Sequence, residues 1–150
     1  MGYFLIIIAI ILLDQISKKI IESKFKIGKR TTIIKNMLYI EHIKNKGAAM
    51  GILKNRPLYL LFMVISSLGN IGIIFLKIIR RPKNQVYKTA LAFILGGGLG
   101  NIFDRIFKKE VTDFISLKYK NFPVFNIADV FVLLGCITFF IKALGDDGYE

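Results

Sequence analysis

The sequence predicts an all-α membrane protein: four transmembrane helices, with a small β-rich element in the loop between helices one and two. Apolar residues make up 54% of the 150 residues, and the mean hydropathy is +0.55, more than a soluble domain of this length carries. Four apolar segments are long enough for a bilayer core of roughly 30 Å at about 1.5 Å of rise per residue: Tyr3–Ile21, Leu58–Ile79, Lys88–Phe107 and Pro123–Leu144. They fill most of the chain, so we expect a single membrane-embedded domain over residues 1–150.

The first segment begins with an uninterrupted apolar run, Tyr3–Leu13, of the kind found in signal-peptide cores. No basic residue precedes the run and no small-x-small cleavage pattern follows it. We therefore predict a retained helix, whose end carries Asp14, Gln15, Lys18 and Lys19.

The loop after this helix has strand-forming composition. Residues 29–43 are rich in β-branched and aromatic side chains, and Gly28 and Asn36 offer turn chemistry, which predicts a strand-bearing element at the membrane surface. The segment Asn45–Gly51 follows, and its small residues permit close backbone approach to a neighbouring helix or a bound peptide.

The third apolar segment ends in the glycine-rich run Gly96–Arg105. Glycines in transmembrane helices usually serve packing. Asn101 shares a helix face with Asp104 at i, i+3 and with Arg105 at i, i+4, whereas Asp104 and Arg105 are neighbours that point apart. Such a polar face at a helix end indicates either interfacial structure or part of a functional site.

Asp129 lies within the fourth apolar segment, where a carboxylate costs about 3 kcal/mol or more. The usual explanation is a functional site with a partner nearby. Asp113 precedes it by sixteen residues, and Lys118–Pro123 offers a turn between them. If Val111–Leu117 folds back against the fourth helix, the two carboxylates meet. One would then keep a proton and the other would not, which gives an acid–base pair able to activate water. The alternative is one structural acid and one solvated acid.

The formal net charge is +12. In a soluble protein this would indicate nucleic acid, but in a membrane protein basic loops that meet anionic lipid headgroups explain it better. Eleven basic residues lie between Lys18 and Arg56, so a simple positive-inside count places loops one and three in the cytoplasm.

Cys136 is the single cysteine, which excludes an intramolecular disulfide, and we interpret it as a packing residue. The single histidine, His42, argues against a zinc or triad site.

Five ordered segments carry a family resemblance. They are Asp14-Gln15-Ile16-Ser17-Lys18, Asn45–Gly51, Gly96–Arg105, Val111-Thr112-Asp113-Phe114 and Phe125-Asn126-Ile127-Ala128-Asp129. In their order and spacing the chain resembles the lipoprotein signal peptidases, also called signal peptidase II. One departure is Met50, where the family usually has Phe.

The resemblance implies a membrane aspartic peptidase without metal or cofactor. It would remove signal peptides from prolipoproteins just before a diacylglyceryl-modified cysteine. Asp113 and Asp129 would form the catalytic dyad. The strands of loop one would form a cradle around the substrate. The substrate-binding or supporting residues would be Asp14, Lys18, Asn45, Gly47, Asn101, Asp104, Arg105, Asn126 and Ala128.

The resemblance also implies a monomer in contact with membrane lipids and not with nucleic acid. Both termini would lie in the cytoplasm, and the active site would lie near the outer face of the cell membrane. The charge count argues for the opposite orientation, and we give five ordered motifs more weight than a statistical bias. Two other functions remain open from the residues alone: a small proton-coupled transporter and a non-catalytic helix bundle. The bundle would tolerate Asp-to-Asn exchange.

Overall fold

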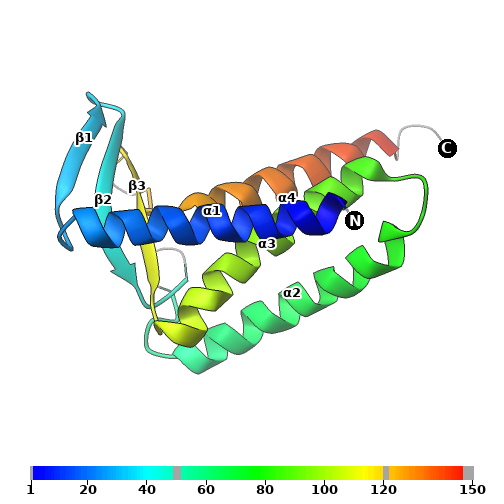
Figure 1. The fold of residues 1–150 in the computed structure, drawn as a ribbon, viewed down its shortest axis with the longest axis horizontal. Helices are drawn as coiled ribbons and strands as arrows, with labels where there is room; N and C mark the ends of the chain where they lie inside the picture. The colour runs from blue at the N-terminus through cyan, green and yellow to red at the C-terminus, as the bar shows by residue number, and fades with distance from the viewer. Residues whose placement is uncertain (1, 49–51, 120–121, 147–150) are drawn as a thin grey trace.

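Four helices form a bundle, and a small sheet covers one end of it (Figure 1). The computed structural model of the chain describes residues 2–48, 52–119 and 122–146. The helices are α1 (Gly2–Lys24), α2 (Pro57–Ile79), α3 (Gln85–Phe107) and α4 (Ile127–Asp146). Both ends of the described chain and the α2–α3 turn lie at the end of the bundle opposite the sheet (Figure 1).

Helix α3 is the central element, and it packs against each of the other three helices. Its glycines make this possible. A Cβ on Gly96 would lie 2.9 Å from Ile10 of α1, and one on Gly98 would lie 2.5 Å from Leu68 of α2. A Cβ on Gly97 would lie 2.3 Å from a backbone oxygen of α4. The predicted packing role of this glycine run is therefore confirmed.

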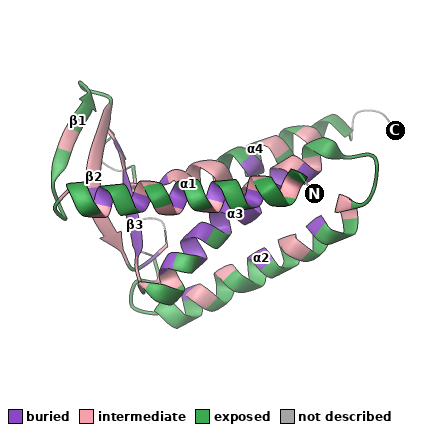
Figure 2. Cartoon of the chain, viewed as in Figure 1, coloured by how far each residue is buried: buried purple, intermediate pink, exposed green. Residues whose placement is uncertain are grey.

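The outward faces of the bundle are apolar. Among the described residues, α2, α3 and α4 are long and apolar enough to cross a membrane. Most of α2 and half of α4 is exposed in the isolated chain (Figure 2), and the exposed residues include large apolar ones such as Leu58, Phe62 and Phe140. Since lipid tails would cover such a surface, the helical membrane class is confirmed. Helix α1 has comparable length but carries several charged residues towards its end.

The sheet has three antiparallel strands in the order β1 (Arg30–Ile34), β2 (Leu38–Asn45) and β3 (Val111–Leu117). The first two strands are those predicted in loop one. The third comes from the segment after α3, for which no strand was predicted. Its pairing with β2 sets Ile43 opposite Asp113, so the sheet places one of the two acids of interest at a fixed position.

Helix α4 begins at Ile127 and not at Pro123 as the sequence suggested. The reason is that the preceding segment bonds to β3. Phe125 accepts backbone hydrogen bonds from Phe114 and Ile115 and donates one to Ile115. The chain therefore stays extended up to Asn126, and Asp129 falls in the first turn of α4.

Candidate active site

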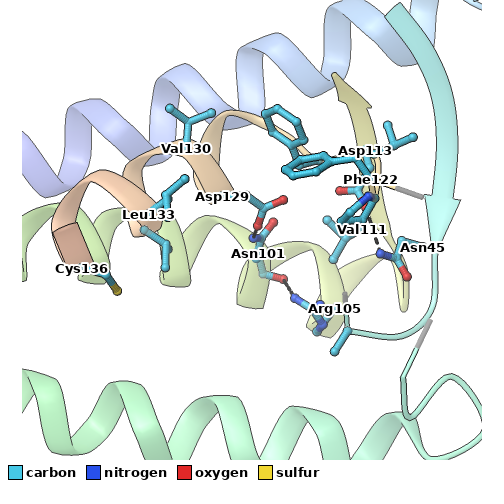
Figure 3. A pocket seen from close by; sticks show the side chains of 15 residues that line it. Asn45, Asn101, Arg105, Val111, Asp113, Phe122, Asp129, Val130, Leu133 and Cys136 are labelled. Atoms are coloured by element: carbon cyan, nitrogen blue, oxygen red, sulfur yellow. Dashed lines mark hydrogen bonds between the residues drawn. The ribbon is translucent and has the colours of Figure 1, made fainter. Parts of the chain in front are cut away.

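Asp113 and Asp129 line the same cavity, where the sheet meets the bundle (Figure 3). The cavity has a volume of about 400 Å³ and mostly apolar walls. Asp113 enters it from β3 and Asp129 from the first turn of α4. The sequence suggested that Asp113 and Asp129 lie close together, and in the structure they do, because Asp113 is held on a strand beside the start of α4.

A reciprocal cap fixes Asp129. The backbone N–H of Asp129 donates to Oδ1 of Asn126 at 3.0 Å, and the backbone N–H of Asn126 donates to Oδ2 of Asp129 at 3.1 Å. This is a capping box in which Asn126 is the N-cap and Asp129 is the third helical residue. The pattern Asn-x-x-Asp was a readable helix-start signal that the sequence interpretation missed.

Neutral amides hold both carboxylates. Asp129 also accepts a hydrogen bond from Nδ2 of Asn101 at 2.7 Å. Asp113 accepts one from Nδ2 of Asn126 at 2.7 Å and one from Nδ2 of Asn45 at 2.9 Å. Asn126 therefore contacts both acids and links them to each other. Each carboxylate has two N–H donors, and within the described residues neither one forms an ion pair.

This environment favours a proton on the pair. Burial raises the pKa of the Asp113 carboxyl to about 6; the hydrogen bond from Asn45 lowers it, and the negative charge of Asp129 raises it. Two carboxyl groups that share a poorly solvated cavity do not both ionise cheaply. The arrangement is therefore suited to one protonated and one ionised carboxyl, which general acid–base catalysis requires.

The orientation of the amides is also fixed. Oδ1 of Asn101 accepts from the Lys18 ammonium at 2.9 Å and from Nδ2 of Asn126 at 3.1 Å. The Nδ2 group of Asn101 must then face Asp129. Oδ1 of Asn45 accepts from the backbone N–H of Gly47 at 2.9 Å, so its Nδ2 group faces Asp113.

Behind the cavity lies a buried ion cluster of Asp14, Lys18 and Asp104, whose side chains have no exposed area. The Lys18 ammonium lies 2.7 Å from a carboxylate oxygen of each acid. Asp104 also pairs with Lys108 at 3.1 Å; its contacts with both lysines are ion pairs without hydrogen-bond geometry. Asp14 accepts from the backbone N–H of Ala128 at 3.1 Å. The cluster therefore joins α1, α3 and the start of α4 and does not line the cavity.

Arg105 does line the cavity, and its guanidinium donates to the backbone oxygen of Gly47 at 3.2 Å. It also donates to the backbone oxygen of Asn101 at 3.3 Å. Arg105 thus ties α3 to the segment after β2, and Asp104 points to the other side, towards α1. The rest of that segment, residues 49–51, lies outside the described residues, and this includes Met50.

Cys136 corrects one sequence interpretation. It is exposed on α4 and lines the cavity, so the assignment as a packing residue was wrong. The face of α4 that carries Asp129 continues through Val132, Leu133 and Cys136, and this face forms the apolar wall. Sequence periodicity could not identify it, because α4 is apolar on almost every face. His42 lies away from the cavity, and its Nδ1 contacts the backbone oxygen of Phe25 at 2.7 Å.

Comparison with known proteins gives a consistent result. A family model described as signal peptidase (SPase) II matches residues 6–145. The lipoprotein signal peptidase of Halalkalibacterium halodurans is 39% identical over 149 residues, which is 98% of this chain and 94% of that protein. The one from Clostridium novyi is 40% identical over 143 residues, covering 93% and 95%. A solved structure described as a bacterial membrane enzyme matches with a TM-score of 0.86 at 31% identity, covering 99% of this chain and 91% of its own.

Proposed function

The chain belongs to the signal peptidase II family of aspartic peptidases, and we propose that Asp113 and Asp129 are its two catalytic carboxylates. The protein is a membrane peptidase that removes signal peptides from prolipoproteins. The observation that supports the assignment of the dyad is the single cavity that both acids line, with Asn126 donating to one and capping the other. The transporter and the non-catalytic bundle are not favoured.

In the proposed mechanism, Asp129 is the ionised carboxylate and Asp113 carries the proton. Asp129 accepts a proton from a water molecule as the water oxygen attacks the scissile carbonyl carbon. Asp113 gives its proton to the carbonyl oxygen, which forms a tetrahedral diol. The proton on Asp129 then passes to the leaving nitrogen while the C–N bond breaks. Asp113 recovers a proton from the diol as the new carboxyl group forms, and the pair returns to its starting state.

The cavity walls fit a lipidated, apolar substrate. Val130, Val132 and Leu133 line it on the α4 side, and such a wall suits a signal-peptide segment and an acyl chain. This wall is consistent with the substrate that the family resemblance implies, a prolipoprotein bearing a diacylglyceryl cysteine, cut just before that cysteine. The enzyme works as a monomer among membrane lipids. It needs no metal or cofactor, because the described residues hold no group of three or more His, Cys, Asp or Glu side chains that could bind a metal ion, and the two carboxylates supply the acid and the base.

The proposed topology has four spans, with α1 as the fourth, both termini in the cytoplasm and the dyad near the outer face. Both ends of the described chain and the α2–α3 turn lie at the end of the bundle opposite the sheet (Figure 1). Lys29 lies at the sheet end and Lys83 in the α2–α3 turn, and both are exposed. In a Cys136→Ala background, an impermeant thiol reagent should label Lys29→Cys but not Lys83→Cys in intact, wall-stripped cells. The reverse pattern would place the dyad on the cytoplasmic side and overturn the proposed topology.

A cleavage assay with a diacylglyceryl-modified prolipoprotein tests the dyad. Asp113→Asn and Asp129→Asn should each lower turnover by about 100-fold or more, since an amide cannot exchange the proton. Asp146→Asn, at the far end of α4, is the matched control and should keep wild-type turnover. Wild-type turnover in either dyad variant would rule out the assignment.

A further inference from the structure

A second cavity of about 440 Å³ adjoins the catalytic cavity. Asn45, Asp113, Pro123 and Val124 line both cavities, so they form a shared wall. From this wall the second cavity extends away from α4. Its other lining residues come from the end of β2 and from the segment that leads to α2: Ile43, Lys44, Lys46, Gly47, Lys54 and Asn55.

The two cavities differ in chemistry. The catalytic cavity continues along the apolar face of α4, whereas the second cavity ends among lysines. The Lys44 ammonium lies 2.8 Å from Glu22, so its charge is partly balanced. Lys46 and Lys54 are exposed, and no acidic side chain in the described part of the chain pairs with either. The second cavity therefore carries net positive charge.

A substrate chain with its scissile bond at the dyad has two unlike halves. The signal peptide is apolar, and the segment that follows the lipidated cysteine is polar and leaves the membrane. Among the described residues, only the catalytic cavity has an apolar wall along a helix, and only the second cavity is lined by lysines. Because Asp113 belongs to the wall between them, a chain that passes from one cavity to the other passes the dyad.

We propose that the second cavity binds the first residues of the mature lipoprotein after the lipidated cysteine, and that Lys46 and Lys54 make it favour acidic side chains over basic ones. This inference rests on the proposed function. Asn55 also lines this cavity, where its side-chain amide can bind the substrate backbone, whereas the amide of Asn45 is already bonded to Asp113 and Gly47. Two exposed lysines should give only a modest preference between substrates. Each exposed charge pair changes kcat/KM by about 1.5- to 5-fold, and salt screens the effect.

Three lipidated substrates that differ only in the two residues after the cysteine, Asp-Asp, Ser-Ser or Lys-Lys, test the proposal. At low ionic strength kcat/KM should fall in that order, by about 10-fold overall. In the double variant Lys46→Gln/Lys54→Gln the order should collapse to within about twofold, as it should for the wild type at high salt. The matched control is Lys35→Gln/Lys83→Gln, which removes two exposed lysines elsewhere and should keep the preference.

Each outcome separates this proposal from the proposed function. Equal cleavage of all three substrates by the wild type would overturn the subsite and leave the peptidase intact. A preference that persists in the Lys46→Gln/Lys54→Gln variant would overturn the assignment to these lysines. An equal loss with all three substrates would mean that the lysines hold something common to every assay, such as a lipid phosphate, and would also contradict the proposal. Failure to cleave any of them would instead contradict the proposed function.

Discussion

Removing the ammonium of Lys18 is the sharpest perturbation that the structure offers. Lys18→Met keeps the length of the side chain and its apolar stem. It deletes contacts at 2.7 Å to Asp14, 2.7 Å to Asp104 and 2.9 Å to Asn101. All three members of the ion cluster are fully buried, so water cannot replace the lost charge.

The expected loss of stability in Lys18→Met depends on the contacts that the two acids keep. Asp14 keeps the backbone N–H of Ala128, and Asp104 keeps Lys108 at 3.1 Å. Removing one partner of a buried ion pair costs about 3–5 kcal/mol, because an uncompensated charge stays behind. With these residual partners we expect about 3 kcal/mol, at the lower end of that range. Lys19→Met, one position along on the exposed face of α1, should change stability by less than about 0.5 kcal/mol.

The assay is reversible unfolding in detergent, read by circular dichroism. A double-mutant cycle with Asp104→Asn measures the coupling between Lys18 and Asp104, since the second substitution removes one of the two carboxylates that Lys18→Met leaves without its ammonium partner. We expect the double variant to be more stable than the sum of the single effects predicts, by about 1–3 kcal/mol. A cost below about 1 kcal/mol for Lys18→Met, together with no coupling, would refute the account of the cluster.

Activity gives a second readout, measured where the variant stays folded. Without Lys18, Oδ1 of Asn101 keeps only the hydrogen bond from Asn126. The amide can then turn, and Asp129 loses a donor. A hydrogen bond to a charged group is worth about 1.5–3 kcal/mol, so kcat should fall by about tenfold or more while KM changes little. An unchanged kcat in folded Lys18→Met would show that the orientation of Asn101 does not depend on this lysine.

Three further predictions concern the same site. Activity should be lost as pH rises through the pKa of Asp113, about 6, because the dyad needs one proton. In Asn45→Leu the loss should shift to higher pH, because the hydrogen bond from Asn45 lowers this pKa. A pH profile of activity that stays flat up to alkaline pH would contradict the mechanism. Gly97→Ala should cost about 1–3 kcal/mol in detergent unfolding, since its Cβ would lie 2.3 Å from the backbone oxygen of Ala128, whereas Gly69→Ala, with nothing within 4 Å, should cost nothing measurable. Cleavage should survive EDTA, and a loss that a divalent ion restores would contradict the metal-free mechanism.

The parts of the site that the sequence predicted are those that follow from local physics. A carboxylate in an apolar segment is costly, and this identified Asp129 and prompted the search for Asp113. Helical spacing placed Asn101 and Asp104 on one face and separated Asp104 from Arg105. The glycine run of α3 predicted close packing. Each of these inferences needs only neighbours within a few residues.

The parts that could not be predicted depend on contacts between distant segments. The i, i+4 spacing of Asp14 and Lys18 is visible in the sequence, but the contacts of Lys18 with Asp104 and Asn101 cross more than eighty residues. The strand Val111–Leu117 exists because β2 pairs with it, and its sequence alone carries no clear alternation. The start of α4 could have been predicted, since the Asn-x-x-Asp pattern that begins at Asn126 is a local signal, but Pro123 suggested an earlier start.

The conflict between loop charge and proposed topology weakens once the first loop is seen as a folded unit. The positive-inside bias is strongest for short loops near the ends of helices, whereas this loop holds the strands β1 and β2, which pair with each other, and β2 also pairs with β3. Some of the counted charges are also committed to the fold, because Lys18 is buried with two acids and Lys44 pairs with Glu22. If the second cavity binds the mature segment, its lysines serve the substrate as well. The basic residues of this loop then serve ion pairs in the fold and binding of the substrate, so their number says less about the side of the membrane on which the loop lies.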